Sequence, residues 1–200
     1  IYNWREKERT MSQIRAILQK FVQNGQKLTR AAHKDGYRIP FLRKPKLTNR
    51  IASLEKYQGQ PDDPQLIQKW NQLVELGYAN EILDDSRGFY CRSFTIKKKA
   101  KKERRLINDL RNLNKYVKHK KTRMPGLETA LTSLRQRDWM SVVDVERGYY
   151  NVKIHPQDRK YFRFNVGIRT FEMNVLPMGY IGSMEAFRAY MKPFLLTLKV

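Results

Sequence analysis

Apolar residues recur along the chain with a helical period in some segments and a strand period in others. Residues 11–21 carry apolar side chains at helical spacing, which predicts an amphipathic helix that ends at Asn24-Gly25. A second helix is predicted from Asp63-Pro64, an N-cap followed by a proline, as far as Gly77. Its buried stripe is expected to comprise Leu66, Ile67, Trp70, Leu73 and Val74.

Alternation of apolar and polar residues predicts strands elsewhere in the chain. Two hairpins are expected, one with the lysine-rich residues 97–103 at its tip and one that turns at Gly167-Ile168-Arg169. A mostly apolar run that reaches Asp144 predicts a further, buried strand. The expected strands cover residues 88–96, 105–110, 139–145, 161–166 and 170–175.

Two more helices complete the pattern, one over residues 127–135 and one near the C-terminal end through Ala186, Phe187 and Tyr190. Helices and strands that follow one another in this way predict an α+β fold. Residues 25–50 differ from both, because Pro40 and Pro45 forbid a continuous helix there.

The segment 25–50 is therefore predicted to be a basic extended arm. Its apolar residues Tyr37, Ile39 and Phe41 are expected to anchor on a neighbouring surface. The charge and scattered aromatic residues of residues 1–50 suggest an arm that a partner orders.

The charge of the chain is large and clustered. The 200 residues contain 41 Lys and Arg against 19 Asp and Glu, a formal net charge of +22. With 40% hydrophobic and 12% aromatic residues, the chain is too apolar for a disordered basic tail. Residues 97–123 supply half of the net charge, and the apolar residues threaded through them argue against a solvated tail.

A polyanion is the expected partner of this basic strip, and a nucleic acid is the polyanion that the sequence favours. A solvated surface is the alternative interpretation. The residues expected to contact the nucleic acid, which is RNA in the interpretation preferred below, are Lys97, Lys98, Lys99, Lys101, Lys102, Arg104, Lys115, Lys118, Lys120, Lys121 and Arg123.

Other classes of site are disfavoured by the residue types present. A single cysteine, Cys91, excludes an internal disulfide and a cysteine-based zinc site, and it predicts an intracellular, reducing compartment. His33, His119 and His155 are dispersed and show no metal-ligand spacing. The longest apolar runs fall far short of the roughly 20 residues of a bilayer span, so no membrane segment is predicted.

Asp144 is the one carboxylate in the expected strand over residues 139–145. A charge in such a strand is costly unless it is paired or bound to a metal. It could cap the next turn or pair with Arg147, or it could serve metal-dependent phosphoryl transfer. Spacing alone leaves both interpretations open.

Four stretches of the chain, in order, resemble the motifs of reverse transcriptases. They are RGFYCRSFTIKKKAKKERRLINDLRNLNKYVKHKKTRMPGLETAL, DWMSVVDVERGYYNVKIHPQDRKYFRF, LPMGY and, ahead of them, GYRIPF. The last is similar to a segment of the DIRS-like group of tyrosine-recombinase retrotransposons. The resemblance covers about residues 35–200. It implies the fingers and part of the palm of a right-hand polymerase fold, with residues 51–140 as a fingers-like region and 141–200 as a partial palm. Residues 1–50 precede these regions as the basic helical and extended arm that their charge and residue pattern predict.

The resemblance also implies roles for individual residues. Asp144 resembles the first catalytic aspartate of the palm, and Val145 would offer its backbone carbonyl to the same Mg²⁺ ion. Tyr149 matches the aromatic residue under the incoming sugar, and Arg105 matches the fingers arginine that grips the triphosphate. Met178 and Gly179 lie in the motif that resembles the palm loop beside the nucleotide, although Met178 stands where the family usually has Phe or Gln.

The second carboxylate motif of the family, Tyr-x-Asp-Asp, does not occur in these 200 residues. After Asp144 the acids are Glu146, Asp158, Glu172 and Glu185, with no adjacent pair, so these 200 residues alone cannot assemble a two-metal site. Asp144 would then be vestigial or one half of a site.

Two functional interpretations follow. The preferred one is a retrotransposon-derived, domesticated and non-catalytic RNA-binding protein that needs no cofactor. It would act as a structural subunit, with protein neighbours, of a large ribonucleoprotein such as a ribosome. The alternative is the N-terminal half of an active RNA-directed DNA polymerase, a nucleotidyltransferase that requires Mg²⁺.

Overall fold

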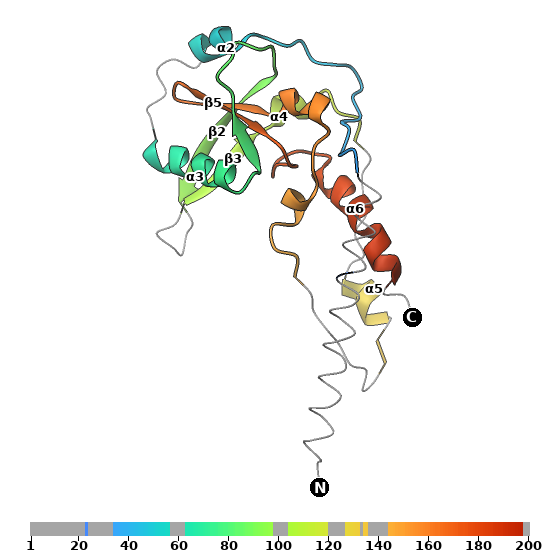
Figure 1. Cartoon of the computed structure of the whole chain (residues 1–200). Coiled ribbons are helices and arrows are strands. Elements are labelled where there is room, and N and C mark those ends of the chain that lie inside the picture. The colour runs from blue at the N-terminus through green and yellow to red at the C-terminus, as the bar shows by residue number, and fades with distance from the viewer. Residues whose placement is uncertain are drawn as a thin grey trace.

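The computed structural model of the chain is built around one five-stranded sheet (Figure 1). It describes residues 23, 34–56, 63–97, 104–119, 127–132, 134–135 and 144–197. The helices are α2 (Arg50–Lys56), α3 (Pro64–Glu75), α4 (Arg111–Asn114), α5 (Leu127–Thr132) and α6 (Ser183–Thr197), with 3₁₀ helices η1 (Gly148–Asn151) and η2 (Pro156–Tyr161). The strands are β1 (Ala79–Glu81), β2 (Tyr90–Lys97), β3 (Arg104–Asp109), β4 (Arg163–Val166) and β5 (Arg169–Met173).

The sheet has the strand order β1-β5-β4-β2-β3 and mixes two pairing directions. β2 and β3 form one antiparallel hairpin, β4 and β5 form another, and β1 pairs antiparallel with β5. The two hairpins join through the parallel pairing of β2 with β4, in which Tyr90 lies opposite Arg163. The α+β fold class predicted from the sequence is therefore confirmed.

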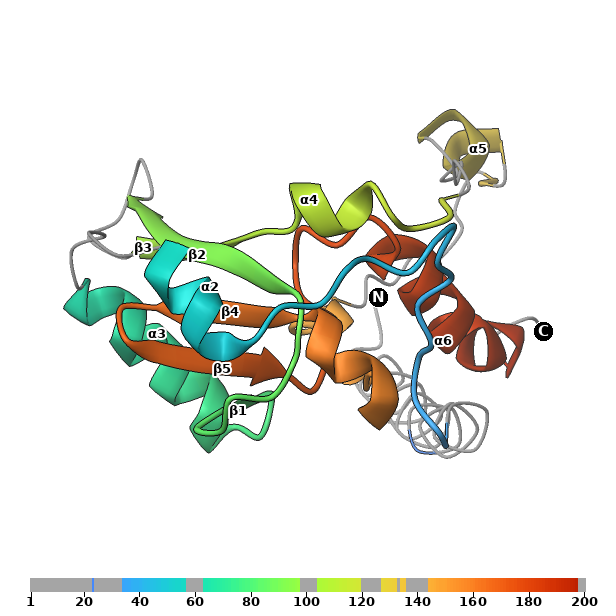
Figure 2. The same cartoon turned by 90° about the horizontal axis from the view of Figure 1, so that it is seen from above.

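Helix α3 covers one face of the sheet (Figure 2). Asp63 caps its N-terminus by accepting hydrogen bonds from the backbone N–H groups of Gln65 and Leu66. Trp70 is fully buried, and its ring stacks on Phe171 at 5.0 Å and lies 5.2 Å from Phe164. These aromatic contacts join α3 to β4 and β5 and form the centre of the core.

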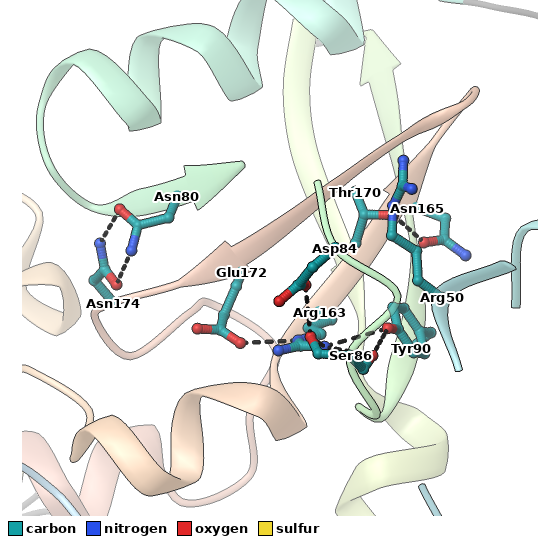
Figure 3. A network of polar contacts seen from close by, with 10 residues as sticks. All are labelled: Arg50, Asn80, Asp84, Ser86, Tyr90, Arg163, Asn165, Thr170, Glu172 and Asn174. Carbon is teal, nitrogen blue, oxygen red and sulfur yellow. Dashed lines mark hydrogen bonds and ion pairs between the residues drawn. The ribbon is translucent and has the colours of Figure 1, made fainter. Parts of the chain in front are cut away.

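A polar network closes the opposite face of β4 and β5 (Figure 3). The buried Arg163 guanidinium lies 2.8 Å from the Glu172 carboxylate and donates to Ser86 and to the Tyr90 hydroxyl. Arg50 of α2 donates to the Thr170 hydroxyl in the same layer. Because every buried donor needs a partner, this network lets the loop before β2 and helix α2 cover a polar sheet face.

Residues 36–42, here called the strap, form an extended segment that bonds to residues 116–118 and to residues 153–155 (Figure 2). Ile39 is buried in the common core, and Tyr37 and Phe41 pack against it. Phe41 also forms an isolated bridge with Val117. The apolar residues of the expected arm thus anchor on their own chain rather than on a separate partner.

Several predicted elements are confirmed with shifted ends. The helix begins at Pro64 after its Asp63 cap, and both hairpins occur as expected. Val74, predicted to be buried, is 36% exposed, because α3 turns only Leu66, Trp70 and Leu73 fully into the core. Helix α5 ends at Thr132 rather than at residue 135.

Other predictions fall outside the described residues. These are the helix over residues 11–21, the tip of the first hairpin and the greater part of the strand expected over 139–145. Among the residues that the structure describes, none forms a helix long and apolar enough to cross a membrane.

Candidate nucleotide and nucleic-acid interface

Strand β2 reverses the usual distribution of polar and apolar side chains. Its buried positions include Ser93 and Thr95, whereas Phe94 is 40% exposed and Ile96 is 44% exposed. A sheet with one buried face normally turns its apolar residues inward. The reversal needs both a way to satisfy the buried hydroxyls and a reason to expose the apolar side chains.

The buried hydroxyls are fully paired. Ser93 Oγ accepts from the Trp70 indole N–H at 3.1 Å and lies 2.9 Å from Asn108 Oδ1, to which it donates. Thr95 Oγ1 donates to Asp63 at 2.7 Å, and this hydrogen bond is the main reason why the pKa of the Asp63 carboxyl is lowered. The buried face of β2 is therefore a specific polar junction with α3.

The exposed side of β2 and β3 forms what we call the open face. The antiparallel register pairs Phe94 with Ile107 and Ile96 with Arg105, so these side chains share one side of the hairpin. Arg92 pairs with Asp109 on the same side. Apolar surface bordered by guanidinium groups can stack with bases and neutralise phosphates at the same time.

The described basic residues of the segment 97–123 differ in where their side chains lie. Arg105 is exposed on the open face, and Lys97, Lys115 and Lys118 are exposed as well. Arg104 points to the other side, where it donates to Thr95 Oγ1 at 2.6 Å. The predicted RNA contacts Lys98, Lys99, Lys101, Lys102, Lys120, Lys121 and Arg123 lie outside the described residues.

The segment 176–182 approaches the edge of the sheet at β3. Met178 is 56% exposed, while Leu176 is buried. Gly179 has a positive φ of 93°, and a Cβ there would lie 2.8 Å from the Asn108 carbonyl oxygen, so only glycine fits. The Asn114 side chain donates to the Gly179 carbonyl and accepts from the Ile181 N–H, both at 3.0 Å. The segment is thereby held against β3 and α4.

Tyr149 lies in η1 and packs against helix α6. Its ring meets that of Phe187 edge-on, with the centroids 5.8 Å apart. Gly148 allows this approach, because a Cβ on it would come within 3.1 Å of the Phe187 ring. Since α6 begins at Ser183, directly after the segment 176–182, the contact brings η1 and that segment into one assembly.

Asp144 and Val145 lie just before η1, and both are exposed. The prediction that Asp144 carries a costly buried charge is therefore wrong, since water solvates its carboxylate. The predicted pairing with Arg147 is also wrong, because Arg147 lies 3.6 Å from Glu146 instead. Among the described residues, no three His, Cys, Asp or Glu side chains gather where a metal ion could be held.

The structure thus brings together some predicted site residues and leaves others apart. Gly179 abuts the strand that bears Arg105, and Tyr149 packs on the helix that follows Met178 and Gly179. The open-face residues Phe94, Ile96 and Ile107 were missed. The signal that could have found them is the alternation along β2, in which hydroxyl residues occupy every second position and large apolar residues occupy the positions between them.

Cys91 has no place in this interface. It is buried in β2, and burial raises the pKa of its thiol to about 12. Such a thiol is inert at neutral pH.

Comparison with known proteins agrees with the motifs. The family model described as "Reverse transcriptase (RNA-dependent DNA polymerase)" matches residues 96–200. A polyprotein of Cassava vein mosaic virus is 26% identical over 134 residues, which are 65% of this chain and 21% of the polyprotein.

Two retroviral relatives match shorter stretches. The Gag-Pol polyprotein of Walleye dermal sarcoma virus is 32% identical over 95 residues, 47% of this chain and 5% of the polyprotein. The Gag-Pro-Pol polyprotein of Mouse mammary tumor virus is 30% identical over 114 residues, 53% of this chain and 6% of the polyprotein. The chain therefore spans about a fifth or less of the length of these relatives. Since the family model covers more than half of its residues, the chain belongs to the reverse transcriptase (RNA-dependent DNA polymerase) family.

Proposed function

We propose that the chain supplies the fingers and the first part of the palm of an RNA-directed DNA polymerase. The observation that carries the proposal is the convergence of two separate sequence regions, β3 and η1, on the segment 176–182 and the helix α6 that directly follows it. Gly179 abuts the strand of Arg105, and Tyr149 packs on the helix that follows Met178. These are the residues that the family resemblance assigns to the incoming nucleotide.

In this proposal the open face receives the nucleic acid. The rings and branched side chains of Phe94 and Ile96 offer apolar surface for bases, and the guanidinium groups of Arg92 and Arg105 neutralise phosphates. An RNA template and a growing DNA strand are both polyanions, so binding should weaken steeply as the salt concentration rises.

Mg²⁺ would be held at Asp144 and Val145, with further carboxylates from outside these 200 residues. A carboxylate and a backbone carbonyl are the oxygen donors that Mg²⁺ prefers, and the exposure of both residues leaves room for them. When bound, the ion would activate the attacking hydroxyl and stabilise the leaving oxygen. Tyr149 and Arg105 would position the nucleotide sugar and its phosphates.

Primer extension by the native protein that contains these residues tests the proposal. We expect Mg²⁺-dependent extension of a DNA primer on an RNA template, and we expect Asp144→Asn to reduce it at least a thousandfold. Glu146→Gln is the matched control, because Glu146 is an exposed carboxylate two residues away. Equal activity of the two variants would refute the assignment of Asp144.

A second function, RNA binding without catalysis in a ribonucleoprotein such as a ribosome, is favoured by the clustered charge of residues 97–123. It predicts that Asp144→Asn leaves RNA binding and assembly intact. Reversal of charge at Lys97, Lys98, Lys99, Lys101 and Lys102 should release the protein from RNA.

The intact mass of the native protein decides which of the two functions is tested first. A mass near that of these 200 residues favours the non-catalytic role. A much larger protein with Tyr-x-Asp-Asp downstream favours the polymerase. The viral polyproteins among the relatives favour the larger protein and the polymerase function. The specific affiliation with DIRS-like elements stays a prediction.

A further inference from the structure

The strap of residues 36–42 is bonded to the segment that leads into η2. The Tyr37 N–H donates to the Lys153 carbonyl at 2.8 Å, and the His155 N–H donates back to the Tyr37 carbonyl at 2.9 Å. Gly36 makes this approach possible, since its φ is 85° and a Cβ on it would lie 2.8 Å from the His155 nitrogen. The Ile39 N–H donates to the buried Asp158 carboxylate at 3.0 Å.

The other end of the strap is bonded to the chain that follows α4. The Leu42 N–H donates to the Tyr116 carbonyl at 2.8 Å, and the Lys118 N–H donates to the Pro40 carbonyl at 2.7 Å. The strap therefore ties residues 116–118 to residues 153–158, which are otherwise distant in sequence.

Residues directly before each of the tied regions also hold the segment 176–182. On one side, the Leu176 N–H donates to the Val152 carbonyl at 2.9 Å. On the other side, Asn114 bonds to Gly179 and Ile181. The strap is thus placed to set the spacing between the two supports of that segment.

One side-chain contact joins the strap to the segment directly. The hydroxyls of Tyr37 and Tyr180 lie 3.1 Å apart, and the two rings meet edge-on at 6.1 Å. Tyr180 is 4% exposed and packs edge-on against Phe162 at 5.1 Å. A buried hydroxyl that loses its partner is penalised, so the pair favours a single position of Tyr180.

We propose that the strap is a clamp that fixes the segment 176–182 against β3, and that Tyr37 is its positioning residue. Tyr37 acts through Tyr180 and not by contact with the nucleotide. The consequence for nucleotide binding rests on the proposed function, whereas the clamp itself can be tested without any activity.

Hydrogen exchange of the chain is the first measurement. Tyr37→Phe removes only the hydroxyl, and we expect the Leu176 and Ile181 amides to exchange about fivefold faster, the factor typical of one lost hydrogen bond. Tyr90→Phe is the matched control. It removes a hydroxyl bonded to the Ser86 carbonyl and to Arg163, and it should leave those two amides unchanged.

A double-mutant cycle makes the test specific to the pair. If the two hydroxyls act on each other, the exchange effects of Tyr37→Phe and Tyr180→Phe combine to less than their sum. Fully additive effects, or equal effects of Tyr37→Phe and Tyr90→Phe on the Ile181 amide, would overturn the clamp.

In the primer-extension assay, Tyr37→Phe should raise the KM for the nucleotide severalfold and leave kcat nearly unchanged, since a misplaced segment weakens binding. Tyr90→Phe should change neither constant. An unchanged KM despite faster exchange would overturn the link to nucleotide binding. A native protein without polymerase activity would instead refute the proposed function and leave the exchange result standing.

Discussion

The two hairpins of the sheet are covered to different extents. β4 and β5 are enclosed on both faces, by the aromatic contacts of Trp70 in α3 on one side and by the Arg163 network on the other (Figure 3). Of β2 and β3, α3 covers one face, whereas on the open face Phe94 and Ile96 are exposed in the part of the chain that the structure describes.

This difference indicates that one hairpin mainly stabilises the fold and the other mainly offers a contact surface. The enclosed hairpin has its side chains fixed by packing and by paired charges, and changes there should act on folding. The open hairpin exposes apolar area that contributes little to its own fold, and exposed apolar area beside cations is typical of a binding surface. Each of the following variants tests one side of that division.

The largest loss of stability is expected from Trp70→Ala. The change opens a cavity between α3 and two phenylalanine rings, which should lower the free energy of unfolding by about 3–5 kcal/mol. Urea denaturation followed by circular dichroism measures it. Leu83→Ala, at a side chain that is 79% exposed, is the control and should change the free energy of unfolding by less than about 0.5 kcal/mol. If Trp70→Ala lowered the free energy of unfolding by less than about 1 kcal/mol, Trp70 would not be at the centre of the core.

A somewhat smaller loss is expected from Glu172→Gln. The change leaves the Arg163 guanidinium, whose side chain is 8% exposed, without its counter-charge, and the cost should be about 3 kcal/mol. Glu81→Gln breaks the more exposed pair with Arg169 and should cost about 1 kcal/mol or less. If the two variants were equally stable, the enclosure of β4 and β5 would not depend on the buried pair.

Acidification should produce a moderate loss. The Arg169 hydrogen bond lowers the pKa of Glu81, and the Arg111 hydrogen bond lowers the pKa of Asp109. Because these folded-state pKa values lie below the unfolded ones, the stabilisation is complete above the unfolded values and is lost as the pH falls through the folded ones. The free energy of unfolding should therefore be steady from pH 7 to about 5 and decline below about pH 4.5. Urea titrations across this range measure the decline, and Glu81→Gln should reduce it. If Glu81→Gln showed the same dependence of unfolding free energy on pH as the unmodified chain, Glu81 would not contribute to the loss of stability in acid.

The enclosed hairpin was predictable from the sequence, because local signals determine it. The Asp63-Pro64 cap, the spacing of Trp70 and the turn at Gly167 each act within a few residues, and each was confirmed. The strap was predicted as extended, with its apolar residues anchored on a neighbouring surface. Which surface it would be was not predicted, since no local pattern shows that Tyr37 lies beside Tyr180.

The candidate site was predicted mainly through family motifs. These singled out Tyr149 and Gly179, whose roles stay predictions, and the structure shows how their elements pack. The exposure of Asp144 could not be inferred, because an apolar run in the sequence does not reveal which of its ends reaches water.

The smallest effect on stability is expected from Phe94→Ala, and this variant tests the open face most directly. A side chain that is 40% exposed contributes little to packing, so the free energy of unfolding should change by less than about 1 kcal/mol. If a base stacks on the ring, affinity for single-stranded RNA should fall by about 1–3 kcal/mol. Fluorescence anisotropy with a labelled RNA at fixed salt measures the affinity. Ile168→Ala is the matched control, because Ile168 is 82% exposed at the turn of the enclosed hairpin. It should leave both stability and RNA affinity unchanged, and an equal loss of affinity in the two variants would mean that exposed apolar area, rather than the open face, governs binding.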